Sequence, residues 1–276
     1  MRGDEPLNRQ QDFLETIIDS KRARLAREMS ARPLASVREA AQVIRASAPS
    51  HALRAALTDG TRLNVIAEIK RASPSKGEIR SDADPIGIAR EYAANGAAAI
   101  SVLTEEDYFK GSLDDLRAVK AAVAVPVLRK DFIFDEWQVY ETAEAGAEAL
   151  LLIVAALADE ELANLRQLTE EKLGMDALVE VHDVEELRRA VHCGANLVGV
   201  NNRNLRTFAV SLDVSREISR HAPADVLLIS ESGLRTHDDL RGLRARGFTG
   251  FLIGETLMRA EQPGAALREM IAGGSE

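Results

Sequence analysis

Residues 64–77 read N-V-I-A-E-I-K-R-A-S-P-S-K-G, and this stretch decides the fold because it joins a buried strand to a polar loop. Its apolar, mostly β-branched start predicts a strand, which Glu68 and Lys70 interrupt. Side chains alternate along a strand, so Ile66, Glu68 and Lys70 share one face. A carboxylate and an ammonium side by side on a buried strand carry a desolvation cost. The pair therefore indicates a functional site, rather than an internal ion pair above a solvated turn, and we expect the loop 72–77 to be mobile and to suit an anionic ligand.

The composition excludes several classes of protein. The chain has 276 residues and a net charge of −9, which argues against a general nucleic-acid binder but not against an anionic small molecule. A single cysteine, Cys193, excludes an intrachain disulfide framework, and the five histidines show no metal-ligand spacing. The N-terminus lacks the apolar core of a signal peptide, and no apolar run reaches about 18 residues. We therefore expect a cytoplasmic protein with no metal and no membrane contact.

After a helical, polar segment from about 11 to 59, strands and helices alternate regularly. The expected strands are 64–70, 98–103, 125–130, 149–154, 177–182, 197–201, 226–231 and 250–253. Apolar strands separated by helices predict a parallel sheet covered by helices. Eight units, with no G-x-G-x-x-G after the first strand, favour a closed (β/α)8 TIM barrel over a doubly wound sheet. We predict one α/β domain, 1–276, in which the helical N-terminal extension 1–60 plugs one end of the barrel or helps to close a site.

Polar side chains gather at the strand ends, where the active sites of this fold lie. They are Glu68, Lys70, Lys130, Glu180, Asn201, Arg203, Glu231 and Ser232, whereas the fourth strand contributes only an apolar wall. A single polar residue at one strand end is readily explained by a structural role. Five strand ends with such groups are hard to explain by stability, because each group would be desolvated in the barrel mouth.

The loops after the seventh and eighth strands are candidates for a phosphate site. Gly233 and Gly254 let the backbone approach an anion closely, although plain turn chemistry also explains them. Arg203, Lys70 and Ser73 add side-chain donors. Glu255 has the wrong charge for this role, so we expect it to offer its backbone N–H and turn its carboxylate out.

Seven motifs, in order, resemble those of one enzyme family. They are V-I-A-E-I-K-R-A-S-P-S-K-G (65–77), V-L-T-E-E-D-Y-F-K-G-S (102–112), P-V-L-R-K-D-F-I (126–133), L-V-E-V-H (178–182), V-G-V-N-N-R-N-L (198–205), I-S-E-S-G (229–233) and F-L-I-G-E-T-L-M (251–258). From about Phe13 to Met258 the chain resembles indole-3-glycerol phosphate synthases. The resemblance implies a (β/α)8 enzyme of tryptophan biosynthesis that needs no metal or organic cofactor. Such an enzyme converts 1-(2-carboxyphenylamino)-1-deoxyribulose 5-phosphate into indole-3-glycerol phosphate, carbon dioxide and water.

The resemblance also implies roles for individual residues. Lys130 resembles the general acid that protonates the ketone oxygen. The other residues that match catalytic positions are Glu68, Lys70, Glu180, Asn201 and Ser232. Residues that match the phosphate cradle are Ser73, Arg203, Gly233, Gly254 and Glu255. Residues that match substrate-binding positions are Phe109, Phe132, Leu151, Leu252 and the acidic Glu231. Asn202 departs from the serine that relatives often carry, and we expect a small effect.

The substrate's chemistry fits these residue types. Its carboxylate, ketone and phosphate need cations and an apolar slot, and expelling water needs acids that work near neutral pH. A lysine with an ordinary pKa of about 10.4 is a poor acid, so we expect burial and the Lys70 ammonium to lower the pKa of Lys130. The alternatives are another phosphate-binding barrel isomerase, such as phosphoribosylanthranilate isomerase, a barrel that binds a phosphorylated metabolite without turnover, and a structural barrel. We expect a monomer whose partner is a small phosphorylated substrate.

Overall fold

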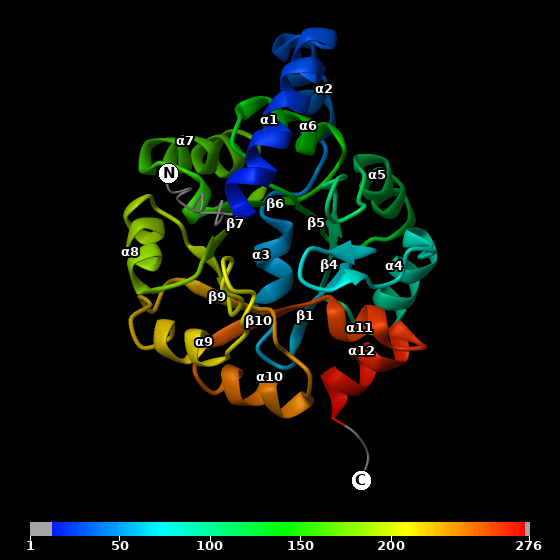
Figure 1. Cartoon of the computed structure of the whole chain (residues 1–276), viewed down its shortest axis with the longest axis vertical. Helices are drawn as coiled ribbons and strands as arrows, with labels where there is room; N and C mark the ends of the chain where they lie inside the picture. Colours follow the sequence, from blue (N-terminus) through cyan, green and yellow to red (C-terminus); the bar gives the residue numbers. More distant parts are fainter. Residues whose placement is uncertain (1–12, 274–276) are drawn as a thin grey trace, which may run out of the picture.

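The computed structural model describes residues 13–273, and its centre is a closed barrel of eight parallel strands (Figure 1). Around the barrel the strands follow the order β1-β10-β9-β8-β7-β6-β5-β4. Their bounds are β1 Asn64–Ile69, β4 Ala99–Leu103, β5 Val127–Lys130, β6 Ala149–Ile153, β7 Asp176–Val181, β8 Leu197–Asn201, β9 Leu227–Glu231 and β10 Phe248–Ile253. The prediction of a (β/α)8 barrel is confirmed.

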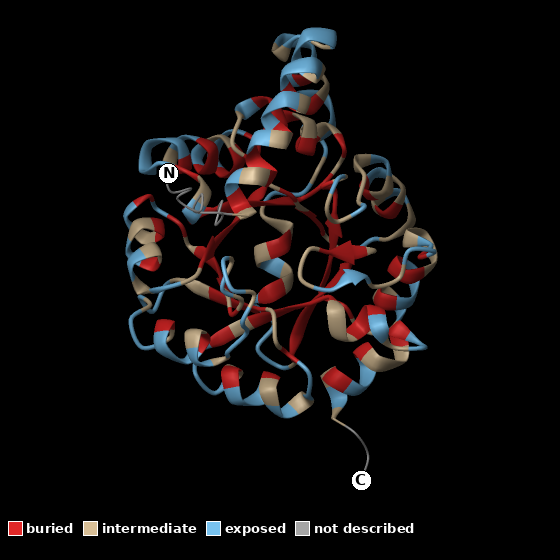
Figure 2. Cartoon of the chain, in the orientation of Figure 1, coloured by how far each residue is buried: buried red, intermediate tan, exposed pale blue. Residues whose placement is uncertain are grey.

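The alternation of β1 separates two apolar layers, as the sequence predicts. Ile66 packs inside the barrel with Leu128 of β5 and Leu178 of β7. Val65 and Ala67 point outward into the larger layer between strands and helices. Figure 2 shows the buried residues concentrated on the strands and on the helix faces turned towards them. Since Glu68 lies on the same face as Ile66, it points to the barrel axis.

Helices cover the outside of the barrel and return the chain to its other end. Their bounds are α4 Pro85–Ala94, α5 Leu113–Ala122, α6 Glu136–Glu144, α7 Asp159–Gln167, α8 Val184–His192, α9 Asp213–Ile218, α10 His237–Arg244, α11 Glu255–Arg259 and α12 Pro263–Ala272. Two expected helices differ from this pattern. The helix expected from Asp159 to Leu173 ends in the π-helical turn η2 (Leu168–Lys172), and the closing helix breaks into α11 and α12. Pro263 explains the break, since it has no backbone N–H to donate and fits the first position of a new helix.

The loop 72–77 forms most of a hairpin, and the expectation that it is mobile stays a prediction. The short strands β2 (Ala72–Ser73) and β3 (Gly77–Glu78) pair antiparallel. Gly77 has a φ of 65°, a left-handed conformation that costs glycine little. The hairpin therefore holds Ser73, Pro74 and Ser75 beside the barrel mouth.

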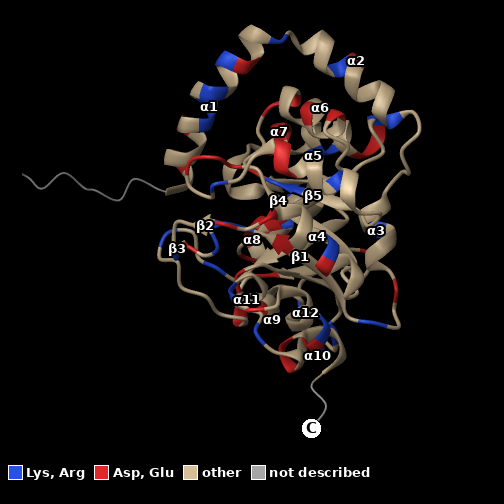
Figure 3. Ribbon diagram, turned by 90° about the vertical axis from the view of Figure 1, so that its right-hand side faces the viewer, with Lys and Arg blue, Asp and Glu red and all other residues tan. Residues whose placement is uncertain are grey.

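The N-terminal extension forms three helices that run along one side of the barrel from its mouth to its base (Figure 3). Their bounds are α1 Phe13–Ala31, α2 Leu34–Arg45 and α3 Ala52–Leu57; the start predicted at Gln11 lies outside the described residues. Leu53 and Leu57 of α3 belong to the apolar cluster inside the barrel, so α3 plugs the base. None of the helices between residues 13 and 273 has the length and apolar character needed to cross a bilayer.

Candidate active site

One cavity of about 750 Å³ lies at the carboxyl ends of the strands, and every site residue predicted from the sequence lines it. The predicted catalytic residues there are Glu68, Lys70, Lys130, Glu180, Asn201 and Ser232. The predicted substrate-binding residues are Phe109, Phe132, Leu151, Glu231 and Leu252. The predicted phosphate-binding residues are Ser73, Arg203, Gly233, Gly254 and Glu255. The barrel therefore brings together groups from all eight of its strands or the loops after them.

Lys130, the last residue of β5, stands between two carboxylates at the centre of the cavity. Its Nζ lies 2.6 Å from Oε2 of Glu180 on β7 and 2.6 Å from Oε2 of Glu231 on β9. A second pair lies beside it, with Nζ of Lys70 2.7 Å from Oε1 of Glu68. All three glutamate side chains are almost fully buried, so these pairs act in a medium of low dielectric constant.

The carboxylates raise the pKa of Lys130, contrary to the expectation that Lys70 would lower it. Burial alone lowers this pKa, but the negative charges of Glu180, Glu231 and Glu68 outweigh burial. Lys70 is neutralised by its own partner, Glu68, so two free ammonium groups do not face each other. Lys130 is therefore an ammonium held in place by hydrogen bonds.

Glu180 and Glu231 share Lys130 but differ in their other partners. Oε1 of Glu180 accepts a hydrogen bond from Nδ2 of Asn201 at 3.1 Å, and Nε2 of His182 lies 3.4 Å away. Oε1 of Glu231 is buried with no hydrogen-bond partner in the part of the chain the structure covers. Burial raises the pKa of Glu231 to about 7, whereas Lys130 and His182 overcome burial and lower the pKa of Glu180. Near neutral pH the pair can therefore hold one exchangeable proton, on Glu231.

Two glycines make room for these carboxylates. A Cβ at Gly199 of β8 would lie 2.1 Å from Oε1 of Glu231, and a Cβ at Gly254 would lie 2.2 Å from Oε1 of Glu68. Atoms cannot approach so closely, so any side chain at either position would displace a carboxylate. The sequence suggested Gly254 only as a backbone donor, and the structure adds this steric reason for a glycine.

The turn after β9 has an unusual backbone that Asn202 supports. Ser232 and Gly233 both have left-handed φ values, 64° and 80°. The buried Asn202 donates from Nδ2 to the carbonyl oxygens of Glu231 at 2.9 Å and Ser232 at 3.1 Å, and its Oδ1 accepts from the backbone N–H of Ser215 at 3.1 Å. Asn202 thus fixes the turn beside the site, a role that its adjacent position in the sequence did not reveal.

The candidate phosphate seat contains a competing carboxylate. Glu255 lies with Oε2 3.6 Å from a guanidinium nitrogen of Arg203 and with Oε1 3.8 Å from Nζ of Lys76. The expectation that this carboxylate turns away from the cations is therefore wrong. Because it pairs with the groups a phosphate would bind, a bound phosphate would have to displace it.

The extension supplies a wall of the cavity that strand-end reasoning missed. Phe13, Leu14 and Ile17 of α1 line the mouth opposite the barrel, together with Phe208 from the loop after β8. The ring of Phe13 meets the ring of Phe208 edge-on, at a centroid distance of 5.8 Å. Both readings of the extension hold, since α3 plugs the base and α1 covers the mouth. In the sequence, the helical spacing of Phe13, Leu14 and Ile17 was the signal that these residues form one apolar face.

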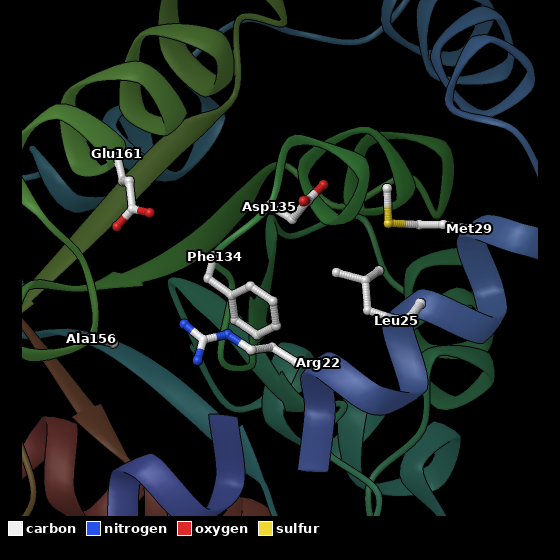
Figure 4. A pocket seen from close by; sticks show the side chains of 8 residues that line it. Arg22, Leu25, Met29, Phe134, Asp135, Ala156 and Glu161 are labelled. Atoms are coloured by element: carbon white, nitrogen blue, oxygen red, sulfur yellow. The ribbon is translucent and has the colours of Figure 1, made fainter. Parts of the chain in front are cut away.

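A buried ion pair holds α1 over the mouth. Nζ of Lys21 lies 2.6 Å from Oδ1 of Asp131, the residue that follows Lys130. Further along α1, Arg22 stacks over the ring of Phe134 at 5.5 Å in a smaller cleft of about 320 Å³, where Figure 4 shows Leu25 and Met29 alongside. That cleft contains none of the predicted site residues, so the larger cavity is the candidate active site.

These observations define the class of the protein: a (β/α)8 barrel enzyme whose mouth presents buried acid–base groups, an apolar slot and cations. Solved structures support the fold alone, including thiamine phosphate pyrophosphorylase from Pyrococcus furiosus (16% identity, TM-score 0.55, covering 75% of this chain and 93% of that chain). A mandelate oxidase variant is similar at 18% identity and a TM-score of 0.57, covering 86% of this chain and 89% of that chain.

Sequence comparison identifies the family. The model described as indole-3-glycerol phosphate synthase matches residues 14–270, and the chain belongs to this family. Proteins of that name are 47% identical in Carboxydothermus hydrogenoformans, over 94% of this chain and 100% of the relative, and 48% identical in a Polaromonas species, over 94% and 98%. A third, from Azospirillum brasilense, is 46% identical over 95% and 99%. The protein is therefore a carboxy-lyase that closes an indole ring with loss of carbon dioxide.

Within residues 13–273, no group of three or more histidine, cysteine, aspartate or glutamate side chains is arranged to hold a metal ion.

Proposed function

We propose that the cavity around Lys130 is where this chain converts 1-(2-carboxyphenylamino)-1-deoxyribulose 5-phosphate into indole-3-glycerol phosphate. The observation that carries this assignment is the position of Lys130 between Glu180 and Glu231, inside a cavity with an apolar wall. The phosphate is assigned to Arg203, Ser73 and the turns at Gly233 and Gly254. The aromatic ring is assigned to the slot lined by Phe109, Phe132, Leu151 and Leu252.

Ring closure needs an electrophilic ketone carbon. In the proposed mechanism, the ammonium of Lys130 donates to the ketone oxygen while the ring carbon that carries the carboxylate attacks the ketone carbon. One carbon–carbon bond forms, the oxygen takes a proton, and the bond to the carboxylate then breaks to release carbon dioxide and restore the aromatic ring. Glu231, with a pKa raised to about 7 by burial, is placed to return a proton to Lys130 at 2.6 Å.

Dehydration requires an acid for the leaving hydroxyl and a base for a proton on the methylene carbon next to the ring nitrogen. Glu180 and the pair of Glu68 and Lys70 stand on opposite sides of Lys130 and are assigned to these proton transfers. Asn201, which donates to Glu180, also faces the cavity and is assigned to orienting the substrate's hydroxyl groups and carboxylate, with Ser232 beside the phosphate. Loss of the hydroxyl as water, with a proton from the acid, and of one proton from that methylene carbon to the base forms the carbon–carbon double bond of the indole ring, and the nitrogen keeps its hydrogen.

A turnover assay tests the assignment directly. The purified full chain should produce the fluorescence of the indole product from this substrate, and Glu180→Gln should lower kcat strongly while KM stays within about twofold. A chain that binds the substrate but never turns it over would support a binding barrel instead. A rise in KM alone in Glu180→Gln would move Glu180 from proton transfer to binding.

The proposal extends to the organisation of the protein. We assign residues 1–276 to one domain that includes the extension 1–60, since α1 contributes to the cavity wall and α3 to the barrel core. We also assign the protein to the cytoplasm as a monomer. Measuring its molecular mass in solution at several protein concentrations tests the monomeric state.

A further inference from the structure

His182 lies directly behind Glu180 and outside the cavity lining. It follows β7 by one residue, and its side chain is 14% exposed. Its Nε2 is buried, has no hydrogen-bond partner among residues 13–273, and lies 3.4 Å from Oε1 of Glu180. A buried ring nitrogen with this single neighbouring acceptor is aimed at the proposed acid–base carboxylate, and hydrogen bonds of catalytic groups often shorten only once substrate is bound.

The other side of the imidazole ring is fixed by Glu186. Oε2 of Glu186 accepts from the backbone N–H of His182 at 2.8 Å and lies 3.0 Å from Nδ1 of its ring. Glu186 is itself held in the first turn of α8, where its backbone N–H donates to Oδ1 of Asp183 at 2.8 Å. This bracing leaves the ring one orientation, with Nε2 towards Glu180.

We infer that His182 is a positioning residue that, as an imidazolium braced by Glu186, keeps Glu180 ionised and oriented for proton transfer. The inference rests on the role proposed above for Glu180. It assigns His182 no contact with the substrate, because Glu180 separates the ring from the cavity. The row Glu186, His182, Glu180 and Lys130 thus alternates in charge from the start of α8 to the centre of the site.

The charges around the ring support the imidazolium form. Burial lowers the pKa of His182, but the facing carboxylates of Glu180 and Glu186 outweigh burial and raise it to about 10. Glu180 in turn faces Lys130 from β5 and the amide of Asn201 from β8, while Glu231 from β9 reaches the row through Lys130. Removing the imidazolium therefore leaves Lys130 as the one cation against Glu180 and raises the pKa of that carboxyl.

The pH profile of turnover distinguishes this role from a structural one. In His182→Leu, we expect the acid limb of the kcat profile, which reports ionisation of Glu180, to move up by about one pH unit, so that kcat falls by up to about tenfold on that limb while KM stays within about twofold. The loss should disappear above the displaced limb, where Glu180 ionises without help. His182→Gln, which keeps a donor but carries no charge, should restore part of kcat and leave the acid limb displaced.

A matched control exists at the C-terminal end of α9. His221, three residues after α9, pairs with Glu217 at 3.2 Å with the same four-residue spacing of histidine and glutamate, but it is exposed and outside the cavity lining. His221→Leu should leave both kcat and its pH profile unchanged. An NMR titration of the wild-type chain should find His182 still protonated at pH 8.5.

Glu186→Gln gives an independent readout if His182→Leu fails to fold. Loss of that carboxylate lowers the pKa of His182, so an alkaline loss of kcat should appear at least one pH unit lower than in the wild type. A loss of kcat that is equal at all pH values, or unchanged acid and alkaline limbs in these variants, would overturn the inference. Full activity of Glu180→Gln would instead remove the proposed role of Glu180, so the two failures can be told apart.

Discussion

A Cβ at Gly254 would lie 2.2 Å from Oε1 of Glu68, so the turn after β10 and the carboxylate at the end of β1 fit together only because position 254 has no side chain. The same glycine belongs to the candidate phosphate seat. Substrate anchoring and acid–base geometry therefore meet at one backbone position. This close approach couples two parts of the site that are far apart in the sequence.

Gly254→Ala should displace Glu68 and lower kcat by at least tenfold, because a rotated carboxylate no longer faces Lys70. The matched control is Gly242→Ala in α10, where an added Cβ meets nothing within 4 Å. That variant should keep full activity and gain about 0.5–1 kcal/mol of stability, since alanine favours a helix more than glycine does. Steady-state kinetics and urea unfolding of the two variants check both expectations. Unchanged kcat in Gly254→Ala would show that the position of Glu68 is not limiting.

Lys130→Met should lose both turnover and stability. Loss of a general acid lowers kcat by roughly 10²–10⁴-fold. It also removes the cation between Glu180 and Glu231, and breaking a buried ion pair in this way costs about 3–5 kcal/mol. Single-turnover fluorescence and urea unfolding measure the two effects.

Lys120 provides the control for the stability part of that experiment. Its ammonium pairs with the buried Glu148 between α5 and β6, outside the cavity lining. Lys120→Met should lose stability and keep kcat. If Lys130→Met keeps near-normal kcat, Lys130 is not the general acid.

The strand ends could be predicted because alternation along a strand is a local rule. Once β1 is a strand of a closed barrel, Glu68 must face inward, and the ends of β5, β7 and β9 then bring Lys130, Glu180 and Glu231 to the same rim. Packing between residues far apart in the sequence could not be predicted from this local rule. The edge-on contact of Phe13 with Phe208 joins residues that are far apart in the sequence, and no local pattern specifies it.

Electrostatic detail also needed coordinates. From the sequence, Lys70 and Lys130 were expected to depress each other's pKa, but each ammonium has its own carboxylate within 2.7 Å. The inward carboxylate of Glu255 likewise depends on contacts with Arg203 and Lys76, which lie on other loops. Residue types at strand ends indicate which groups share a site, whereas distances decide which of them carries the proton.

The raised pKa of Glu231 predicts a specific dependence of stability on pH. Its carboxyl has a pKa of about 7 in the folded chain and about 4.5 when unfolded, so folding takes up a proton between these values. The stability from this group is fully present below about pH 4.5 and is lost as the pH rises to about 7. The difference in unfolding free energy between Glu231→Gln and the wild type should therefore shift in favour of the variant, by at most about 3 kcal/mol, between pH 5 and pH 8. Urea unfolding at these pH values measures the difference, and a constant difference would place the shared proton elsewhere.

Arg203→Ala should weaken substrate binding more than chemistry. A hydrogen bond to a charged group contributes about 1.5–3 kcal/mol, which corresponds to a rise in KM of roughly 10–100-fold. In the same variant Glu255 loses its ion-pair partner, and its unpaired carboxylate then repels the phosphate. Adding Glu255→Gln should therefore restore part of the lost affinity. Arg206, exposed on the same loop and outside the cavity lining, is the control, and Arg206→Ala should leave KM unchanged. A fall in kcat with constant KM in Arg203→Ala would contradict a phosphate role.

The single tryptophan reports whether extension and barrel unfold together. Trp137 in α6 is buried, and its ring N–H donates to the carbonyl oxygen of Arg32 just after α1, at 3.1 Å. If 1–276 is one cooperative unit, the urea midpoint from Trp137 fluorescence should equal the midpoint from far-ultraviolet circular dichroism. Lys21→Met, which removes the buried partner of Asp131, should move both midpoints to lower urea by the same amount. A fluorescence transition that precedes the loss of circular dichroism would show that the extension undocks first and forms a separate unit.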